Sequence, residues 1–300
     1  RDRYVQFDAA SNQGNSGGPL INALGEQVAV VSNKSQDEEN INFAIPIDRV
    51  RENLDELFAP EVRKGFSTGL IIASLANKAE VAQVKKGSPA NKLDLLPGDL
   101  ILRVDGKPIN QHLDWLATLL GHKAGDELKL TVSRDKKKRQ VILKLGLYPS
   151  PPTAKVKDPK PGLFFQVCHG RFDSAPDLNE QTVVKKGVAK ALDVLAMGSP
   201  KTDEFAIKLE GFLKIPADGV YRLILNSDDG SLLRIGNQVV VDNDGPHPAR
   251  DVGTLFRLRK GYLPIRIDYF EATGDAELSF FIEDGSGKRS SAAPLFFHSD

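Results

Sequence analysis

Gly-Asn-Ser-Gly-Gly-Pro-Leu, at residues 14–20, is the stretch from which the fold of the first segment follows. Its glycines permit tight turns, because a residue without Cβ adopts positive φ at little cost. Such a turn exposes the Ser16 hydroxyl. It also directs the backbone N–H groups of Gly14 and Ser16 toward one point, where a tetrahedral oxyanion could be stabilised. The stretch therefore predicts a nucleophile loop, and the alternative is a plain glycine turn between two strands.

The sequence around this loop resembles the HtrA (Do-like, DegP-type) family of trypsin-like serine proteases. The matching segments are Asp-Ala-Ala-Ser-Asn-Gln at 8–13, Gly-Glu-Gln-Val-Ala-Val-Val at 25–31 and Ile-Asn-Phe-Ala-Ile-Pro at 41–46. The resemblance implies that residues 1–55 are the C-terminal fragment of a trypsin-like double β-barrel. It also implies that Ser16 is the nucleophile and that Gly14 and Ser16 donate to the oxyanion.

In that family the general-base His and its orienting Asp precede the serine. Only fifteen residues precede Ser16, and none of them is a His. The histidines all follow it, in segments that we assign to other domains: His112, His122, His169, His247 and His298. Loss of the base lowers kcat by on the order of a millionfold, so we expect this chain alone to be inactive. Because it begins at Arg1 without Met, we expect the His and Asp to be encoded upstream.

Composition narrows the classes of partner. The chain has 300 residues, enough for two or three domains, and its 40 Lys and Arg balance its 40 Asp and Glu. Zero net charge disfavours nucleic acid or an anionic membrane as the main partner. The basic run at 134–139 lies between two strand-like stretches, so it predicts a solvated hairpin tip.

Cysteine usage and hydropathy indicate whether disulfides or membrane-spanning segments are expected. The single cysteine, Cys168, excludes an internal disulfide, and its apolar neighbours predict a buried structural thiol. Larger periplasmic domains with ordinary cores are compatible with this usage. The longest apolar runs, such as residues 70–76, are too short to cross a bilayer.

The middle of the chain has the pattern of an α+β domain. Ser88 and Pro89 predict a helix start, a strand and an Asp-Gly turn follow at 100–106, and residues 111–120 have a helical pattern with Leu113, Leu116, Leu119 and Leu120 on one face. Two strands at 127–133 and 140–145 complete the unit. This order, with Ser-Pro-Ala before Pro-Gly-Asp, resembles the PDZ domains of HtrA proteases over residues 60–147.

The PDZ resemblance implies a partial barrel that adds an extended peptide C-terminus as a strand. Backbone N–H groups of the loop Ser67, Thr68, Gly69 and Leu70 would hold its carboxylate, and Leu70 and Leu116 would line an apolar pocket. Thr68 stands where a large apolar residue is usual. The alternative is that Gly69 only allows a strand to begin.

Residues 148–160 contain several prolines and predict a linker. In residues 161–300, short stretches of alternating apolar and polar residues are separated by turn residues, a pattern typical of an antiparallel β-sandwich. Ser-Asp-Asp-Gly-Ser at 227–231 and Val-Asp-Asn-Asp-Gly at 241–245 resemble the PA14 family, the fourteen-kilodalton protective-antigen domain. In lectin members, paired aspartates hold Ca²⁺ that binds a sugar, often through a cis Asp-Asp bond. Carried over, this implies a Ca²⁺ site with Asp228 and Asp229. Glu271 stands near a later ligand that is usually Asn. The alternative is that the two aspartates only cap a turn.

Together these patterns predict a mainly β, multidomain chain from a periplasmic, secreted or cell-surface HtrA-like serine endopeptidase. It would hydrolyse peptide bonds through an acyl-enzyme without a cofactor, on unfolded or C-terminal peptide substrates. Glycans would be further partners, nucleic acid would not, and a homo-oligomeric parent is compatible with the resemblance. The alternatives are a non-catalytic scaffold that binds peptides and glycans, and a regulatory subunit that docks onto another protease.

Overall fold

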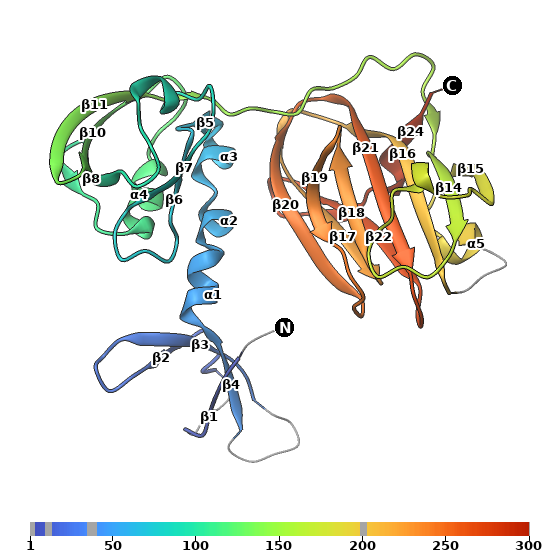
Figure 1. Cartoon of the computed structure of the whole chain (residues 1–300), viewed down its shortest axis with the longest axis horizontal. Coiled ribbons are helices and arrows are strands. Elements are labelled where there is room, and N and C mark those ends of the chain that lie inside the picture. The colour runs from blue at the N-terminus through green and yellow to red at the C-terminus, as the bar shows by residue number, and fades with distance from the viewer. Residues whose placement is uncertain (1–3, 10–13, 35–40, 199–202, 300) are drawn as a thin grey trace. The chain divides into compact units, whose positions relative to one another are not determined.

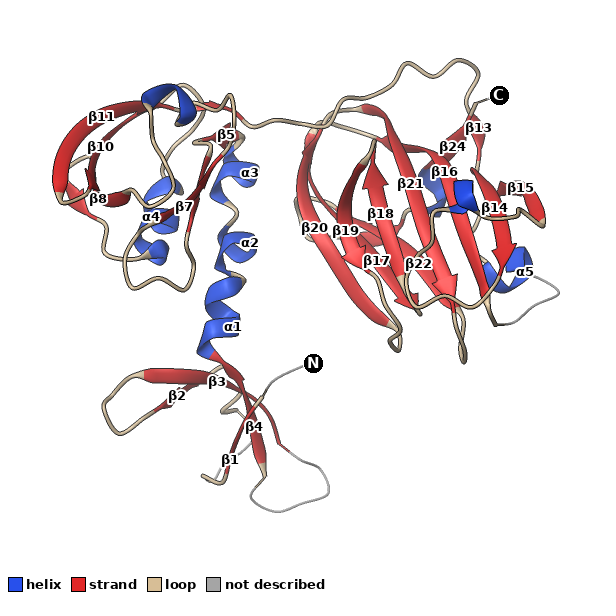
Figure 2. Cartoon of the chain, viewed as in Figure 1, coloured by secondary structure: helices blue, strands red, loops and turns tan. Residues whose placement is uncertain are grey.

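The computed structural model describes residues 4–9, 14–34, 41–198 and 203–299. The chain forms two compact units, Arg1–Leu147 and Tyr148–Asp300 (Figure 1). None of the helices in these described ranges is long and apolar enough to span a membrane. Both units consist mostly of β-strands (Figure 2). The predicted class, a mainly β multidomain chain, is confirmed.

The first segment is a small antiparallel sheet in the order β1-β4-β3-β2. Its strands are β1 Val5–Phe7, β2 Pro19–Ile21, β3 Gln27–Lys34 and β4 Asn42–Pro46. Its buried apolar side chains are those of Ala29 and Ala44, whereas Leu24 is 83% exposed. The described part of this sheet therefore buries little apolar surface, as we expect of a piece of a larger barrel.

Three short helices lead from this sheet into the next body (Figure 2). They are α1 Ile47–Glu52, α2 Leu54–Phe58 and α3 Pro60–Lys64. Ala59, between α2 and α3, has a left-handed backbone with φ of 39°, and Gly65 ends α3 with φ of 75°. Pro60 occupies the start of α3, where its missing N–H costs nothing. The third helix is thus a separate five-residue element.

The second body of this unit is an α+β fold with a four-stranded sheet, β11-β10-β8-β9, and two short ladders, β6-β7 and β12-β5. Its elements are β5 Phe66–Ser67, β6 Leu70–Ile72, β7 Val81–Val84, the 3₁₀ helix η1 Asn91–Leu93, β8 Leu100–Val104, β9 Lys107–Pro108, α4 His112–Leu119, β10 Glu127–Arg134, β11 Lys137–Lys144 and β12 Gly146–Leu147. The Ser88 hydroxyl accepts the Asn91 N–H at 3.2 Å. A short helix follows as predicted, but it is a single 3₁₀ turn that begins at Asn91 after Ala90, so the start predicted at Ser88 and Pro89 is wrong by about one turn.

The buried face of α4 differs from the predicted one. The helix buries His112, Trp115, Leu116 and Leu119. Leu113 and Leu120, predicted to face the core, are each 38% exposed. His112 tolerates burial because its Nε2 lies 2.9 Å from Oδ1 of Asp55 on α2. The buried face of α4 thus contains His112 and Trp115 where leucine spacing predicts Leu113 and Leu120.

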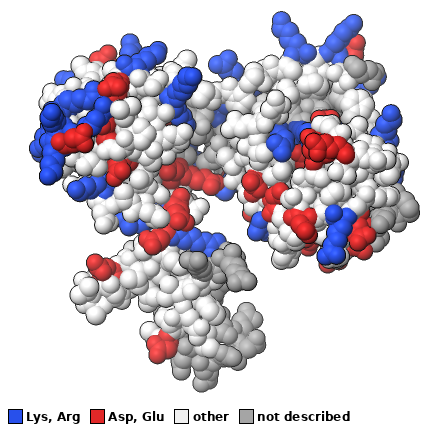
Figure 3. Space-filling model, in the orientation of Figure 1, with Lys and Arg blue, Asp and Glu red and all other residues white. Residues whose placement is uncertain are grey.

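The predicted basic hairpin is present between β10 and β11. Its central residues, Asp135 and Lys136, have φ of 51° and 65°, as a two-residue type I′ turn requires. Lys and Arg side chains gather over this part of the molecule (Figure 3). Arg134 and Arg139, however, turn back to hydrogen-bond the carbonyl of Asp94, each at 2.6 Å. The run is therefore only partly a solvated tip.

The second unit is a sandwich of an eight-stranded sheet and a four-stranded sheet, β20-β17-β22-β23. The eight strands are β13 Lys160–Pro161, β14 Leu163–His169, β15 Lys185–Ala189, β16 Phe205–Ile215, β18 Ser231–Ile235, β19 Gln238–Asn243, β21 Gly261–Glu271 and β24 Phe296–His298. The four are β17 Gly219–Asp228, β20 Arg250–Leu258, β22 Glu277–Glu283 and β23 Arg289–Ser291. The helical elements are η2 Leu178–Glu180, α5 Val194–Gly198 and η3 Ala293–Leu295.

Alternating side chains of both sheets form one core in this unit, which includes Leu209, Leu223, Ile267 and Phe280. A smaller cluster on another face contains Cys168, Leu178 and Phe270. Cys168 is 1% exposed, as predicted for a structural thiol. The finer predicted boundaries, at residues 55, 60 and 160, stay predictions.

Candidate functional sites

The Ser16 loop is an exposed turn that joins the strands of the small sheet. Gly14 and Gly17 have φ of 108° and 84°, conformations that favour glycine. The Gly17 N–H donates to the Val31 carbonyl at 2.8 Å, which fixes the turn against β3. The Ser16 hydroxyl donates to the carbonyl of Ser32 at 3.1 Å. Among the described residues its partner is thus a carbonyl, and a carbonyl cannot serve as a general base.

The loop predicted to bind a peptide carboxylate, residues 67–70, is called the carboxylate loop below. Gly69 has φ of 79°, and a Cβ there would lie 2.1 Å from Cβ and Oγ of Ser88. Glycine is therefore required at this position both by the backbone and by the close approach of Ser88. Ser67 and Thr68 are 7% and 0% exposed. Both residues are therefore buried in this structure.

Glu61 of α3 already contacts the carboxylate loop, and no sequence pattern indicates this contact. The Thr68 N–H donates to Oε1 of Glu61 at 3.1 Å, and the Thr68 hydroxyl hydrogen-bonds the same oxygen. The Leu70 N–H donates to the Thr68 Oγ1 at 3.1 Å. Burial raises the pKa of the Glu61 carboxyl, and the hydrogen bonds from Thr68 and the charge of Lys85 only partly offset this. Two N–H groups of the loop are therefore in use within the chain.

The strand after this loop, β6, pairs with β7 along one edge, and in the described part of the chain its other edge forms no ladder. Leu70 and Leu116, predicted to line the peptide pocket, are 6% and 3% exposed and belong to the same core. Both residues therefore lie in the core of the domain, and β6, which carries Leu70, leaves one edge without a ladder among the described residues.

The Asp228-Asp229 pair lies at the end of β17, and the peptide bond between them is cis. Both carboxylates accept backbone N–H groups from other loops. Asp229 accepts those of His247 at 3.1 Å and Ala272 at 2.9 Å, and Asp228 accepts that of Ala249 at 3.2 Å. The pair therefore holds neighbouring loops together, whatever else it binds.

Glu271, the third predicted ligand, is fully buried. Its Oε2 lies 2.7 Å from the Tyr269 hydroxyl, which also lies 2.6 Å from the Asp228 carbonyl. Its Oε1 is buried without a hydrogen-bond partner. Burial, together with the charges of Asp229, Asp228 and Asp203, raises the pKa of Glu271 to about 7.

These contacts bear on whether Ca²⁺ fits. Within the described ranges, no group of three or more His, Cys, Asp or Glu side chains lies close enough together to hold a metal ion. The carboxylates of Asp228, Asp229 and Glu271 therefore do not form a metal-binding cluster as they lie here. Hard oxygen donors suit Ca²⁺, and the buried Oε1 of Glu271, beside two further acids, has no hydrogen-bond donor.

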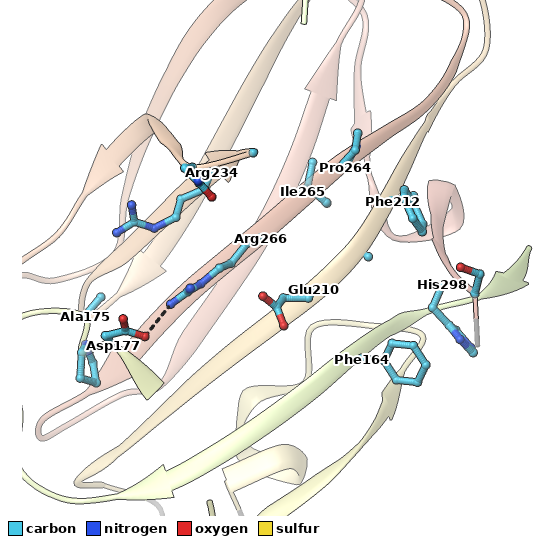
Figure 4. Close-up of a pocket in the computed structure, with 15 residues that line it drawn as sticks. Phe164, Ala175, Asp177, Glu210, Phe212, Arg234, Pro264, Ile265, Arg266 and His298 are labelled. Atoms are coloured by element: carbon cyan, nitrogen blue, oxygen red, sulfur yellow. Dashed lines mark ion pairs between the residues drawn. The ribbon is translucent and has the colours of Figure 1, made fainter. Parts of the chain in front are cut away.

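A pocket of about 680 Å³ lies on the outer surface of the large sheet (Figure 4). Its charged lining includes Asp177, Glu210, Arg234 and Arg266. Arg234 and Arg266 both bind Asp268 through Nε, at 2.9 and 2.6 Å, and Arg266 lies 3.5 Å from Asp177. Because two acids and two arginines line it, the pocket favours neither an anionic nor a cationic ligand.

Comparison with known proteins identifies the parts of the chain. Residues 1–53 match the family model described as Trypsin, residues 50–145 match the PDZ domain, and residues 161–290 match the PA14 domain. The chain joins a trypsin-type segment to a PDZ domain and a PA14 domain. These matches confirm the resemblances drawn from the sequence.

The relatives of the first two parts are named as serine proteases. A relative from Synechocystis sp., named as the serine protease HhoB, is 33% identical over 50% of this chain and 41% of its own length. A relative from Pseudomonas savastanoi, named "periplasmic serine endoprotease DegP-like", is 37% identical over 49% of this chain and 34% of its own. The chain thus spans about two fifths or less of these relatives.

Among solved structures, an epithelial adhesin A domain from Candida glabrata, in complex with Galβ1-3GlcNAc, is 16% identical. The match covers 51% of this chain and 93% of the adhesin domain, with a TM-score of 0.43. This similarity is too weak to bear on function.

Proposed function

We propose that this chain belongs to an HtrA-type serine endopeptidase in which Ser16 attacks the substrate carbonyl. The supporting observation is the exposed Ser16 on its glycine turn, within a segment that matches the trypsin model. In this mechanism the N–H groups of Gly14 and Ser16 stabilise the oxyanion, the amine leaves, and water hydrolyses the resulting acyl-enzyme. The periplasmic names of the relatives support a periplasmic or extracellular location.

The base that accepts the Ser16 proton has to come from outside residues 1–55, because this segment contains no His. We therefore expect the present chain alone to hydrolyse peptides no faster than a Ser16→Ala variant. A fluorophosphonate probe tests the proposal in the protein that contains this chain together with the expected base. It should label that protein and its Ser150→Ala control, but not Ser16→Ala. Equal labelling of all three, or of none, would favour the non-catalytic scaffold.

We further propose that the PDZ domain binds peptide C-termini at the unpaired edge of β6. The support is the pairing of β6 on one side only and the place of Leu70 and Leu116 in one core. An added strand would gain main-chain hydrogen bonds there, and the carboxylate loop lies at its end. A titration with an apolar-ended peptide, as free acid and as C-terminal amide, tests this. Equal affinity for the two forms would exclude carboxylate recognition.

For the PA14 unit we propose Ca²⁺-dependent glycan binding at Asp228 and Asp229, with Glu271 beside them. The observation that favours it is the buried Oε1 of Glu271, which has no hydrogen-bond partner and lies close enough to Asp228 and Asp229 for their charges to act on it. Ca²⁺ that binds only the folded state raises its melting temperature. We expect such a rise in the wild type and in Asp173→Asn, an exposed control, and its loss in Asp229→Asn. No rise in the wild type would leave the pair with its loop-holding role alone.

A further inference from the structure

We infer that Glu61 is an internal competitor for the peptide carboxylate at the carboxylate loop. The inference rests on the proposed peptide binding by the PDZ domain and adds its regulation. The loop already binds a carboxylate, and this carboxylate belongs to the chain itself.

The first argument is the chemical identity of the group. A loop of this kind offers backbone N–H groups to an anionic carboxylate. Here the Thr68 N–H donates at 3.1 Å to a carboxylate oxygen of Glu61, and the Thr68 hydroxyl adds a second hydrogen bond to the same oxygen. Glu61 thus supplies the interaction that a peptide C-terminus would make.

The second argument is that a neighbouring donor is also in use. The Leu70 N–H, at the start of β6, donates to Thr68 Oγ1 at 3.1 Å. Because that oxygen accepts from Leu70, the Thr68 proton is directed to Glu61. The hydroxyl therefore links the second donor to the same carboxylate. Release of Glu61 frees the Thr68 N–H and hydroxyl, whereas the Leu70 N–H keeps Thr68 Oγ1 as its acceptor.

The third argument is burial. Thr68 is fully buried, and Leu70 is 6% exposed. A second carboxylate cannot approach the Thr68 N–H while Glu61 occupies it, since two like charges at that distance repel one another. A peptide carboxylate must therefore displace Glu61, and its binding free energy is reduced by the hydrogen bonds that Glu61 loses.

The position of Glu61 allows such a displacement. It lies on the five-residue helix α3, which left-handed residues, Ala59 and Gly65, separate from the elements on both sides. The charge of Lys85 acts on the same carboxyl, and the Lys85 N–H donates to the Gly69 carbonyl at 2.8 Å. Lys85 would thus remain beside the loop to attract the incoming peptide carboxylate.

The test is a titration of the whole chain with an apolar-ended peptide, as free acid and as amide. Wild type, Glu61→Ala and Glu61→Gln are compared, with Glu80→Ala, an exposed acid of the same domain, as control. We expect free-acid affinity to rise about tenfold in Glu61→Ala, which corresponds to about 1.4 kcal/mol. Affinity for the amide, and affinities of the control, should stay at wild-type values.

The outcomes separate the inference from the function on which it rests. If wild type and both Glu61 variants prefer the free acid equally, peptide recognition stands and the competition is wrong. If none of the proteins prefers the free acid, carboxylate recognition itself fails, and the competition with it. Should Glu61→Ala unfold, Glu61→Gln replaces it: the amide oxygen still accepts from Thr68 but carries no charge, so we expect a smaller gain of a few-fold. A several-fold gain supports competition, and an unchanged affinity overturns it.

Discussion

Arg134 binds the buried carboxylate of Asp99 through two parallel hydrogen bonds, Nε to Oδ1 at 2.7 Å and Nη2 to Oδ2 at 2.9 Å. Asp99 is 1% exposed and also accepts the Leu96 N–H at 3.0 Å. The pair joins the basic hairpin to the Pro-Gly-Asp turn. A run of positive charge that suggested a solvated surface therefore begins with a structural residue.

This pair should make the stability of the PDZ domain depend on acidic pH. Burial by itself raises the pKa of Asp99, but the hydrogen bonds from Arg134 and Leu96 outweigh it, and the pKa is lowered below 3.8. A lowered folded-state pKa gives stability that is present above the unfolded value and is lost as pH falls through the folded one. We expect the unfolding free energy to fall below about pH 4.

The variant Asp99→Asn should lose about 2 kcal/mol at pH 7, less than a fully buried pair because Arg134 is partly exposed. Its acid dependence should also flatten. Denaturation followed by the fluorescence of Trp115, the single tryptophan, reports on this domain because that side chain is 2% exposed in its core. Asp135→Asn, at the hairpin tip, is the control, and an equal loss in both variants would contradict the assignment.

Gly69 and Gly87 form a matched pair that separates steric clash from backbone strain. Both have positive φ, 79° and 74°. An added Cβ meets Ser88 at 2.1 Å at Gly69, but nothing within 4 Å at Gly87. Alanine at Gly87 should therefore cost about 1 kcal/mol from strain alone, and at Gly69 about 3 kcal/mol or more. Denaturation followed by Trp115 fluorescence measures both, and equal costs would show that Ser88 moves aside.

Local signals explain which features the sequence could predict. The turns at Gly14 and at Asp135-Lys136 depend on residues within a few positions, and the strands follow from alternation. The PDZ and PA14 parts were identified from such short patterns.

The remaining features depend on partners distant in sequence. His112 is buried because Asp55 binds it, which leucine spacing cannot indicate. Glu61 reaches Thr68 from the first turn of α3, a short helix that lies between the left-handed residues Ala59 and Gly65. By sequence alone, an acidic residue after a helix-starting proline is an ordinary first-turn residue. The contact of Tyr269 with Asp228 joins residues 41 positions apart. Pairings of this kind are set by the fold.

Cys168 should be inert in the folded protein. Burial raises the pKa of its thiol, which lowers the fraction of reactive thiolate. A thiol-reactive chromophore should modify the native chain on the order of 100-fold more slowly than the denatured chain, because reaction requires local opening. The denatured chain should consume one equivalent, since this is the single cysteine. Rapid modification of the native protein would contradict burial of the thiol.

Tyr269 should contribute strongly to the stability of the PA14 unit. Its one hydroxyl proton faces two acceptors, the Asp228 carbonyl at 2.6 Å and Glu271 Oε2 at 2.7 Å. Both contacts are satisfied together when Glu271 is protonated and donates to the Tyr269 oxygen, in keeping with its raised pKa. Tyr269→Phe removes this link and leaves a second oxygen of Glu271 without a partner.

An unsatisfied buried polar group costs about 1–3 kcal/mol. For a unit of this size that corresponds to a fall in Tm of about 3–10 °C. Calorimetry of the whole chain measures it, and the transition of the PA14 unit is the one that Trp115 fluorescence does not report. Tyr262→Phe is the matched control, because the ring of Tyr262 packs against Phe297, with centroids 5.5 Å apart, and the variant keeps that ring. If both variants melt at the wild-type temperature, the Tyr269 hydroxyl does not hold Glu271 and the Asp228 carbonyl together.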